Sequence, residues 1–226
     1  MVDLDSTRAA TTSKGEARRR SIIEAAAAII RESGPSAVTH RLVAERAGCS
    51  LSATTYYFRG LDDLLYEAGR LNICLWSERA EAVAGEVEAL ASVPDDAQVV
   101  EYLLSATLPA RGPYLGHYIQ LISANDSAPV GHAYREGRQR LNDAIGRAVS
   151  ALALPITAEI AVAIVDGAAV TALSERRDVR ETARALLRRF IKLSRLLQGA
   201  LAPDAAEARR AIAEEHPLPE PLGNDT

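Results

Sequence analysis

Residues 48–58 read GCSLSATTYYF and combine small hydroxyl side chains with two adjacent tyrosines. The segment has too little bulk for a core helix and too little charge for an ordinary surface helix. Hydroxyl groups donate hydrogen bonds to phosphate oxygens and base edges, and small side chains let a helix backbone approach a major groove about 12 Å wide. These residue types therefore indicate contact with DNA.

A tight turn positions this segment. Thr39 and Ser50 are good N-cap residues for two short helices, and Gly48 between them allows the left-handed backbone of a sharp turn. Ala44 and Ala53 are small enough for the helices to approach closely. The pattern predicts a helix-turn-helix, although a helical hairpin inside an ordinary bundle would look similar.

Charge is distributed unevenly along the 226 residues, whose formal net charge is −4. Residues 1–60 hold nine basic and six acidic side chains, which leaves 17 of the 26 basic and 24 of the 30 acidic residues for the remainder. The excess of basic residues in 1–60, followed by an acidic remainder, indicates that the N-terminal part of the chain binds an anionic partner.

The chain is expected to be all-α, because alanine and leucine are abundant and no segment has a convincing strand pattern. Proline and glycine separate the helical segments. Helices are predicted over residues 16–33, 39–48, 50–58, 62–90, 95–108, 112–124, 129–153, 156–175 and 178–200. The predicted organisation is a flexible arm (1–14), a helix-turn-helix domain (15–60), a helical body (61–201) and a partly disordered tail (202–226), with a further short helix possible within the tail.

The order of these features resembles the TetR family of transcriptional regulators. The resemblance is close from Glu16 to Leu65, through the stretch VTHRLVAERAGCSLSATTYYFRGLDDLL, and beyond it covers only helix number and size. Two positions depart from the family pattern: Ser52 stands where Gly or Pro is frequent, and Leu61 replaces a Lys that usually contacts a phosphate.

The resemblance implies a DNA-binding surface at specific positions. Phosphate contacts fall on Thr39, Tyr56 and Tyr57, and base-edge contacts on His40, Arg41, Leu51, Ser52 and Thr55, with Ser50 capping the recognition helix at the same surface. Arg41 can pair with two guanine acceptors or can hold a phosphate. Arg18, Arg19 and Arg20 either add charge beside the minor groove or, for at least one of them, form a solvated helix start.

The resemblance also implies a homodimeric repressor, released from a palindromic operator by a small molecule bound in the body. Polar and aromatic residues that could line the pocket are Asn72, Trp76, Tyr102, Tyr114, His117, Tyr118, Tyr134 and Asp166. The set contains few full charges, so the expected effector is mostly apolar.

Two long C-terminal segments are the expected dimer helices. Residues 156–173 are apolar or small on nearly all sides, and their two acidic residues favour a buried helix over a membrane span. The next helix carries an apolar stripe of Val179, Ala183, Leu186, Leu187, Phe190 and Leu197. Its arginines 180, 184, 188 and 195 either meet an acidic partner or form a solvated face, and the solvated face is the favoured interpretation.

Several functions lack the residues they would need. The sequence has no Gly-rich phosphate loop and no His-Cys metal spacing, so neither a cofactor nor a metal is expected, and a helical-bundle enzyme is the weaker alternative. An architectural DNA binder without an effector is another. Cys49 and Cys74 are interpreted as reduced thiols, and with no apolar leader the protein is expected in the cytoplasm, away from membranes.

Overall fold

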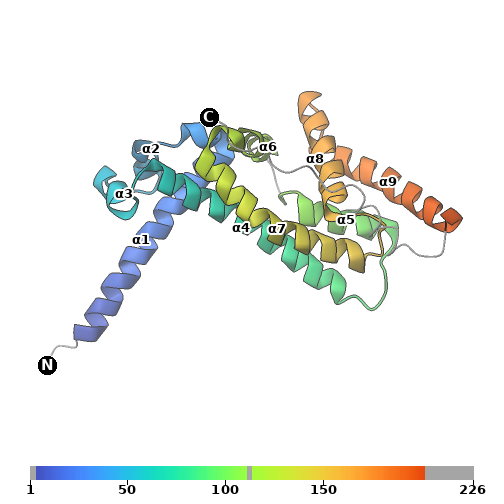
Figure 1. The fold of residues 1–226 in the computed structure, drawn as a ribbon, viewed down its shortest axis with the longest axis horizontal. Helices are drawn as coiled ribbons and strands as arrows, with labels where there is room; N and C mark the ends of the chain where they lie inside the picture. Colours follow the sequence, from blue (N-terminus) through green and yellow to red (C-terminus); the bar gives the residue numbers. More distant parts are fainter. Residues whose placement is uncertain (1–3, 111–113, 202–226) are drawn as a thin grey trace. The chain divides into compact units, whose positions relative to one another are not determined.

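The structure is a computed structural model that describes residues 4–110 and 114–201 (Figure 1). The described residues form α-helices and two short 3-10 helices without any strand, which confirms the all-α prediction. The helices are α1 (Leu4–Ser33), α2 (His40–Arg46), α3 (Leu51–Tyr57), α4 (Leu61–Glu88), α5 (Asp96–Thr107), α6 (Tyr114–Ile122), α7 (Ala128–Ala151), α8 (Ala158–Ser174) and α9 (Val179–Leu201). The predicted tail lies outside the described residues.

The predicted and observed helices agree closely, with one clear exception. Helix α1 begins at Leu4 rather than near Glu16, so most of the segment interpreted as an arm is helical. That segment contains no proline and includes two alanines, and its polar composition does not by itself stop a helix. The 3-10 turns at Pro35–Ala37 and Ser123–Asp126 were not predicted.

The chain divides into two compact units that are described separately. Unit 1 contains residues 1–79 and 109–141, and unit 2 contains residues 80–108 and 142–226. Helices α4 and α7 each contribute to both units. In unit 1, α2 packs on α3 and on α1, and α6 packs along α1; in unit 2, α5, α8 and α9 pack on one another.

Each unit has its own apolar core. In unit 1, Ile22, Ile30 and Leu64 are completely buried, and Phe58 is nearly so. Gly116 lets α6 approach α1, because a Cβ at this position would overlap the backbone carbonyl oxygen of Arg31. In unit 2, the core is built from residues such as Val99, Leu103, Leu104, Leu152, Leu187 and Ile191.

The apolar stripe predicted on α9 is in fact two rows. Val179, Ala183 and Leu187 are buried in unit 2, whereas Leu186 and Leu197 are 42% and 50% exposed. Successive helical positions are about 100° apart, so the adjacent pair Leu186–Leu187 cannot face one surface. Only the outer row is available to another molecule.

The interpretation of the arginines of α9 as a solvated face is wrong for Arg180, Arg184 and Arg195, whereas Arg188 is exposed. Arg184 bonds Glu101 of α5 at 2.5 Å, Arg180 lies 3.7 Å from the same carboxylate, and Arg195 lies 2.5 Å from Asp96. These ion pairs tie α9 to α5, so this face of the helix is directed into unit 2.

Candidate nucleic-acid interface

The α2–α3 hairpin has the caps and the turn that the sequence predicts. The Thr39 hydroxyl accepts a hydrogen bond from the Leu42 amide, and the Ser50 hydroxyl accepts one from the Ala53 amide, each at 3.2 Å. Gly48 between them has φ +60°, a conformation that side chains with a Cβ rarely adopt. These local bonds set where both helices start.

A buried contact between His40 and Thr54 holds the two helices together. The Thr54 hydroxyl donates to the Leu51 carbonyl at 2.8 Å, so its oxygen accepts from Nδ1 of His40 at 3.1 Å. Nδ1 therefore carries a proton, and Nε2 is an acceptor in the neutral ring. Thr54 is fully buried, so its hydroxyl is not available to DNA.

Most of the residues assigned to DNA contact share the exposed side of the hairpin. Tyr56 is 82% exposed and Leu51 is 54% exposed. His40 and Tyr57 are half-buried, and the Tyr57 hydroxyl lies beside Gly15 of α1. Thr39, Arg41, Ser50, Ser52 and Thr55 are exposed.

Helix α1 supports the hairpin through its arginines. Arg18 donates to the carbonyl oxygens of Ala47 and Gly48 at 3.4 Å, where helix α2 ends. Arg19 bonds Glu67 of α4 at 3.0 Å and lies over the Phe58 ring at 5.2 Å. Two of the three arginines considered for the minor groove thus have partners within the protein.

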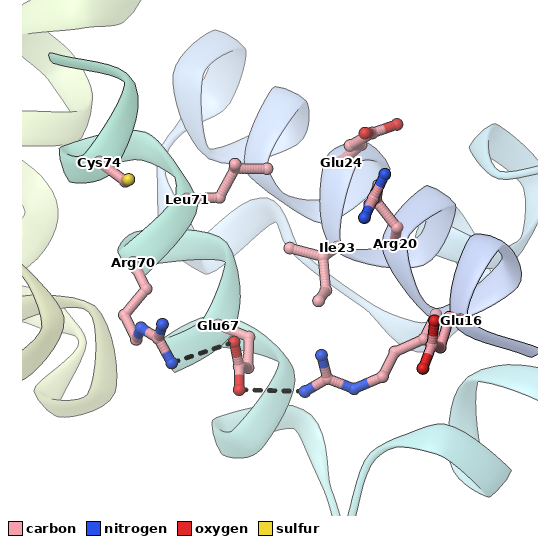
Figure 2. Close-up of a pocket in the computed structure, with 9 residues that line it drawn as sticks. Glu16, Arg20, Ile23, Glu24, Glu67, Arg70, Leu71 and Cys74 are labelled. Carbon is pink, nitrogen blue, oxygen red and sulfur yellow. Dashed lines mark hydrogen bonds and ion pairs between the residues drawn. The ribbon is translucent and has the colours of Figure 1, made fainter. Parts of the chain in front are cut away.

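Arg20 lines a surface groove between α1 and α4 (Figure 2). Ile23 and Leu71 provide its apolar residues, while Glu67 bonds Arg19 and lies 3.7 Å from Arg70. Acidic and basic side chains alternate along this groove, so it has no dominant charge. We assign it a structural role in joining α1 to α4.

A second group of predicted residues comes together inside unit 1. Trp76 is in ring contact with His117 at 4.8 Å and with Tyr134 at 5.3 Å, and His117 contacts Tyr118 at 5.1 Å. All four side chains are buried. They come from α4, α6 and α7, and with Asn72 and Gln120 we call them the Trp76 cluster.

Buried hydrogen bonds connect the Trp76 cluster to helix α1. Arg31 donates to Oδ1 of Asn72 at 2.6 Å, and Nδ2 of Asn72 donates to Oε1 of Gln120 at 3.2 Å. The same Gln120 oxygen accepts from the Tyr134 hydroxyl at 3.0 Å. The network therefore links α1, α4, α6 and α7, and sequence reasoning missed its Gln120 and Arg31 members.

Burial changes the protonation of two cluster residues. The pKa of His117 falls to about 4, mainly because burial penalises its charged form and also because Arg79 and Arg138 are nearby cations. Burial also raises the pKa of Tyr134. Both groups are therefore neutral near pH 7.

The remaining predicted pocket residues are Tyr114, Tyr102 and Asp166. Tyr114 is half-buried at the start of α6. Tyr102 belongs to unit 2, where it lines a groove with Glu86, Gln98 and Arg188. Asp166 is half-buried in α8 of unit 2. Within the described residues, no group of His, Cys, Asp and Glu side chains could hold a metal ion, and no helix is long and apolar enough to cross a membrane.

Comparison with known proteins supports the assignment of the hairpin. Residues 22–68 match the model of bacterial regulatory proteins of the tetR family. No curated relative matches the chain.

Solved structures extend the likeness beyond the hairpin. A TetR-family member from Streptomyces coelicolor A3 is 26% identical, with a TM-score of 0.55 over 77% of this chain and 98% of that one. The multidrug binding protein EbrR, solved with imidazole, is also 26% identical, with a TM-score of 0.53 over 77% of this chain and 89% of its own. A transcriptional regulator from Mesorhizobium loti is 16% identical, with a TM-score of 0.60 over 79% of this chain and 97% of that one, and shows the fold alone.

The matched residues 22–68 contain the whole capped hairpin, together with the helix ends that hold it. The family consists of regulatory proteins rather than enzymes. Residues 22–68 therefore form an N-terminal domain of the tetR family of bacterial regulatory proteins, and the fold of the chain is similar to that of TetR-family transcriptional regulators.

Proposed function

We propose that this regulator is a homodimeric repressor that binds a palindromic operator through α2 and α3 and is released from it by a small-molecule effector. The observation that carries the proposal is the exposed side of the hairpin. Arg41, Thr55 and Tyr56 present a cation and hydroxyls to solvent on a backbone fixed by two side-chain caps. Such groups suit phosphates and base edges.

Arg41 is the residue we assign to base recognition. It is exposed in the first turn of α2 and, among the residues that the structure describes, has no ion-pair partner. A guanidinium group can donate to both O6 and N7 of guanine, which a lysine cannot do in the same geometry. Thr39, Tyr56 and Tyr57 are assigned to phosphates, and His40, Leu51, Ser52 and Thr55 to base edges.

The outer face of α8 and α9 is the proposed dimer interface. Large apolar side chains are exposed on this face without a partner: Val170, Leu186, Leu193, Leu196 and Leu197. A groove between the two helices is floored by the small residues Gly167 and Ala168, which would let a partner helix approach closely. A second copy of the chain offers the same apolar face and would cover it.

The effector is proposed to bind at the Trp76 cluster. Of the groups considered in the body, this cluster alone joins helix α1 of the DNA-binding region to α6 and α7 by buried hydrogen bonds. A ligand that separates Trp76 from His117 would break contacts on which the position of α1 depends. It releases DNA only if it binds the released conformation more tightly.

Selection from random DNA tests the proposed function. Duplexes retained by the full chain should converge on two inverted half-sites, and sedimentation equilibrium should give a dimer mass. Leu197→Glu, on the exposed face of α9, should yield folded monomers that no longer select the palindrome. Convergence on a single asymmetric site, or a monomer mass for the unmodified chain, would refute the proposal.

A further inference from the structure

Two arginines beside the Trp76 cluster have no acidic partner. Arg79 lies three residues after Trp76 on α4, and Arg138 lies four residues after Tyr134 on α7. These spacings place each arginine on the same face of its helix as the cluster residue. Both are half-buried, and neither forms an ion pair with any residue that the structure describes.

Two arginines of unit 2, Arg147 and Arg184, have acidic partners. Arg147 bonds Glu88 with two hydrogen bonds of 2.9 Å, and Arg184 bonds Glu101. The chain has 30 acidic residues and 26 basic ones, so carboxylates are not scarce. Exposed arginines such as Arg41 also lack an ion-pair partner among the described residues, so what distinguishes Arg79 and Arg138 is that they are half-buried without one.

The polar atoms left unsatisfied at the site are donors. Nε of Arg79 and Nε2 of Gln120 are buried, and neither has a hydrogen-bond partner in the structure. Gln120 is only 1% exposed, so water from the bulk does not reach its amide freely. Buried donors without acceptors cost about 1–3 kcal/mol each, and a bound acceptor removes that cost.

Arg31, a third arginine near the cluster, already has a hydrogen-bond partner within the protein. Arg31 is satisfied by the amide oxygen of Asn72, and burial lowers the pKa of its guanidinium. The charges of Arg79 and Arg138 add to the effect of burial in lowering the pKa of His117. A cationic ligand would face three arginines here, whereas an anionic ligand would face buried donors.

We propose that the Trp76 cluster binds an organic carboxylate, whose anionic group pairs with Arg79 and Arg138 and whose apolar part packs against Trp76. This inference rests on the proposed function, because it specifies the chemical class of the effector. It differs from the expectation of a mostly apolar effector, because Arg79 and Arg138 were not among the expected pocket residues. Paired guanidinium–carboxylate hydrogen bonds are among the stronger ones in proteins, and Gln120 adds a neutral donor.

The contacts of Trp76 provide a direct readout. Its ring packs on His117 and Tyr134, so a ligand that enters the cluster must displace it. The chain has a single tryptophan and seven tyrosines, so fluorescence excited selectively at tryptophan reports on this site. Phenylacetate, phenylacetamide and phenethylammonium share a phenyl ring and differ in charge, which makes them suitable probes.

The unmodified chain should bind phenylacetate about tenfold more tightly than either other probe. Arg79→Gln and Arg138→Gln should each remove most of that preference and leave phenylacetamide binding unchanged. Arg135→Gln, an exposed position on the same helix as Arg138, is the matched control and should behave like the unmodified chain. Should a Gln variant fail to fold, Arg79→Lys keeps the charge and should retain part of the preference.

Equal or tighter binding of the neutral or cationic probe would overturn the inference, as would an unchanged preference in the folded Gln variants. So would no fluorescence response to phenylacetate at about 10 mM, where even a weak site is occupied. Operator binding by the same proteins separates the two ideas. Suppose that phenylacetate does not bind, while the protein still binds a palindromic operator and a neutral compound releases it. The proposed function would then stand, and only the anionic class of the effector would be wrong.

Discussion

The exposed hairpin and the Trp76 cluster, both in unit 1, use polar side chains in opposite ways. In the hairpin, hydroxyls at Thr39 and Ser50 satisfy the backbone, while Arg41 and Tyr56 are left to solvent. In the Trp76 cluster, Asn72, Gln120 and Tyr134 bond one another and are buried. Substitutions on the hairpin surface should therefore change binding, and substitutions in the cluster should change folding or its dependence on pH.

The close approach of α6 to α1 should give the largest effect. Gly116→Ala places a methyl group where the Arg31 carbonyl oxygen lies, and backbone cannot move aside as a flexible side chain can. The free energy of unfolding should fall by about 3 kcal/mol or more. Chemical denaturation would measure this loss.

The control for this substitution is Gly146→Ala, in the middle of α7. A Cβ there meets no other atom within 4 Å, so this change should raise the free energy of unfolding by roughly 0.5–1 kcal/mol. If both alanine variants were equally stable, the contact between α6 and α1 would not be as close as described.

Acid should weaken the buried cluster through His117. Its pKa is about 4 in the folded protein and 6.5 when unperturbed, so between these values the unfolded chain binds more protons. Stability linked to this ring is complete above about pH 6.5 and is lost as the pH falls to about 4, by at most about 3 kcal/mol.

Denaturation at a series of pH values measures this loss. His117→Gln should flatten the slope between pH 6.5 and 4, because it removes the buried ring whose pKa is lowered. An identical slope in the His117 variant would mean that the ring is not held neutral by burial.

The two adjacent threonines of α3 offer the smallest and most local comparison. Thr54→Val removes the buried hydroxyl that His40 bonds and should cost about 1 kcal/mol of stability. Thr55→Val should change stability by less than about 0.5 kcal/mol and should weaken DNA binding instead. Chemical denaturation would measure the stability of both variants, and fluorescence anisotropy would measure their DNA binding. A larger stability loss in Thr55→Val than in Thr54→Val would contradict these roles.

Local signals made much of the fold predictable. Thr39 and Ser50 cap the helices that they were expected to cap, and Gly48 has the left-handed turn conformation. Each of these features depends on a residue and its immediate neighbours, which a sequence displays directly. The start of α1 was missed because a polar composition was interpreted as a lack of structure.

Features that depend on contacts between distant residues could not be read in the same way. The partners of Arg184 and Arg195 are in α5, some 80 to 100 positions earlier, and nothing near these arginines indicates them. Arg79 was missed for a similar reason, because its importance comes from a missing carboxylate rather than from a motif. The gathering of Trp76, His117 and Tyr134 was proposed from residue type, and the structure brings these three together.

The most direct test of the account exchanges one arginine at each site. Binding of a selected operator duplex would be followed by fluorescence anisotropy, and binding of phenylacetate by Trp76 fluorescence, for Arg41→Ala and Arg79→Gln. We predict that Arg41→Ala loses roughly 1–3 kcal/mol of operator binding and binds phenylacetate normally. Arg79→Gln should bind the operator normally and lose its preference for phenylacetate. Operator binding that survives Arg41→Ala, or that is lost in folded Arg79→Gln, would contradict the assignment of DNA recognition to the exposed hairpin and of ligand recognition to the buried cluster.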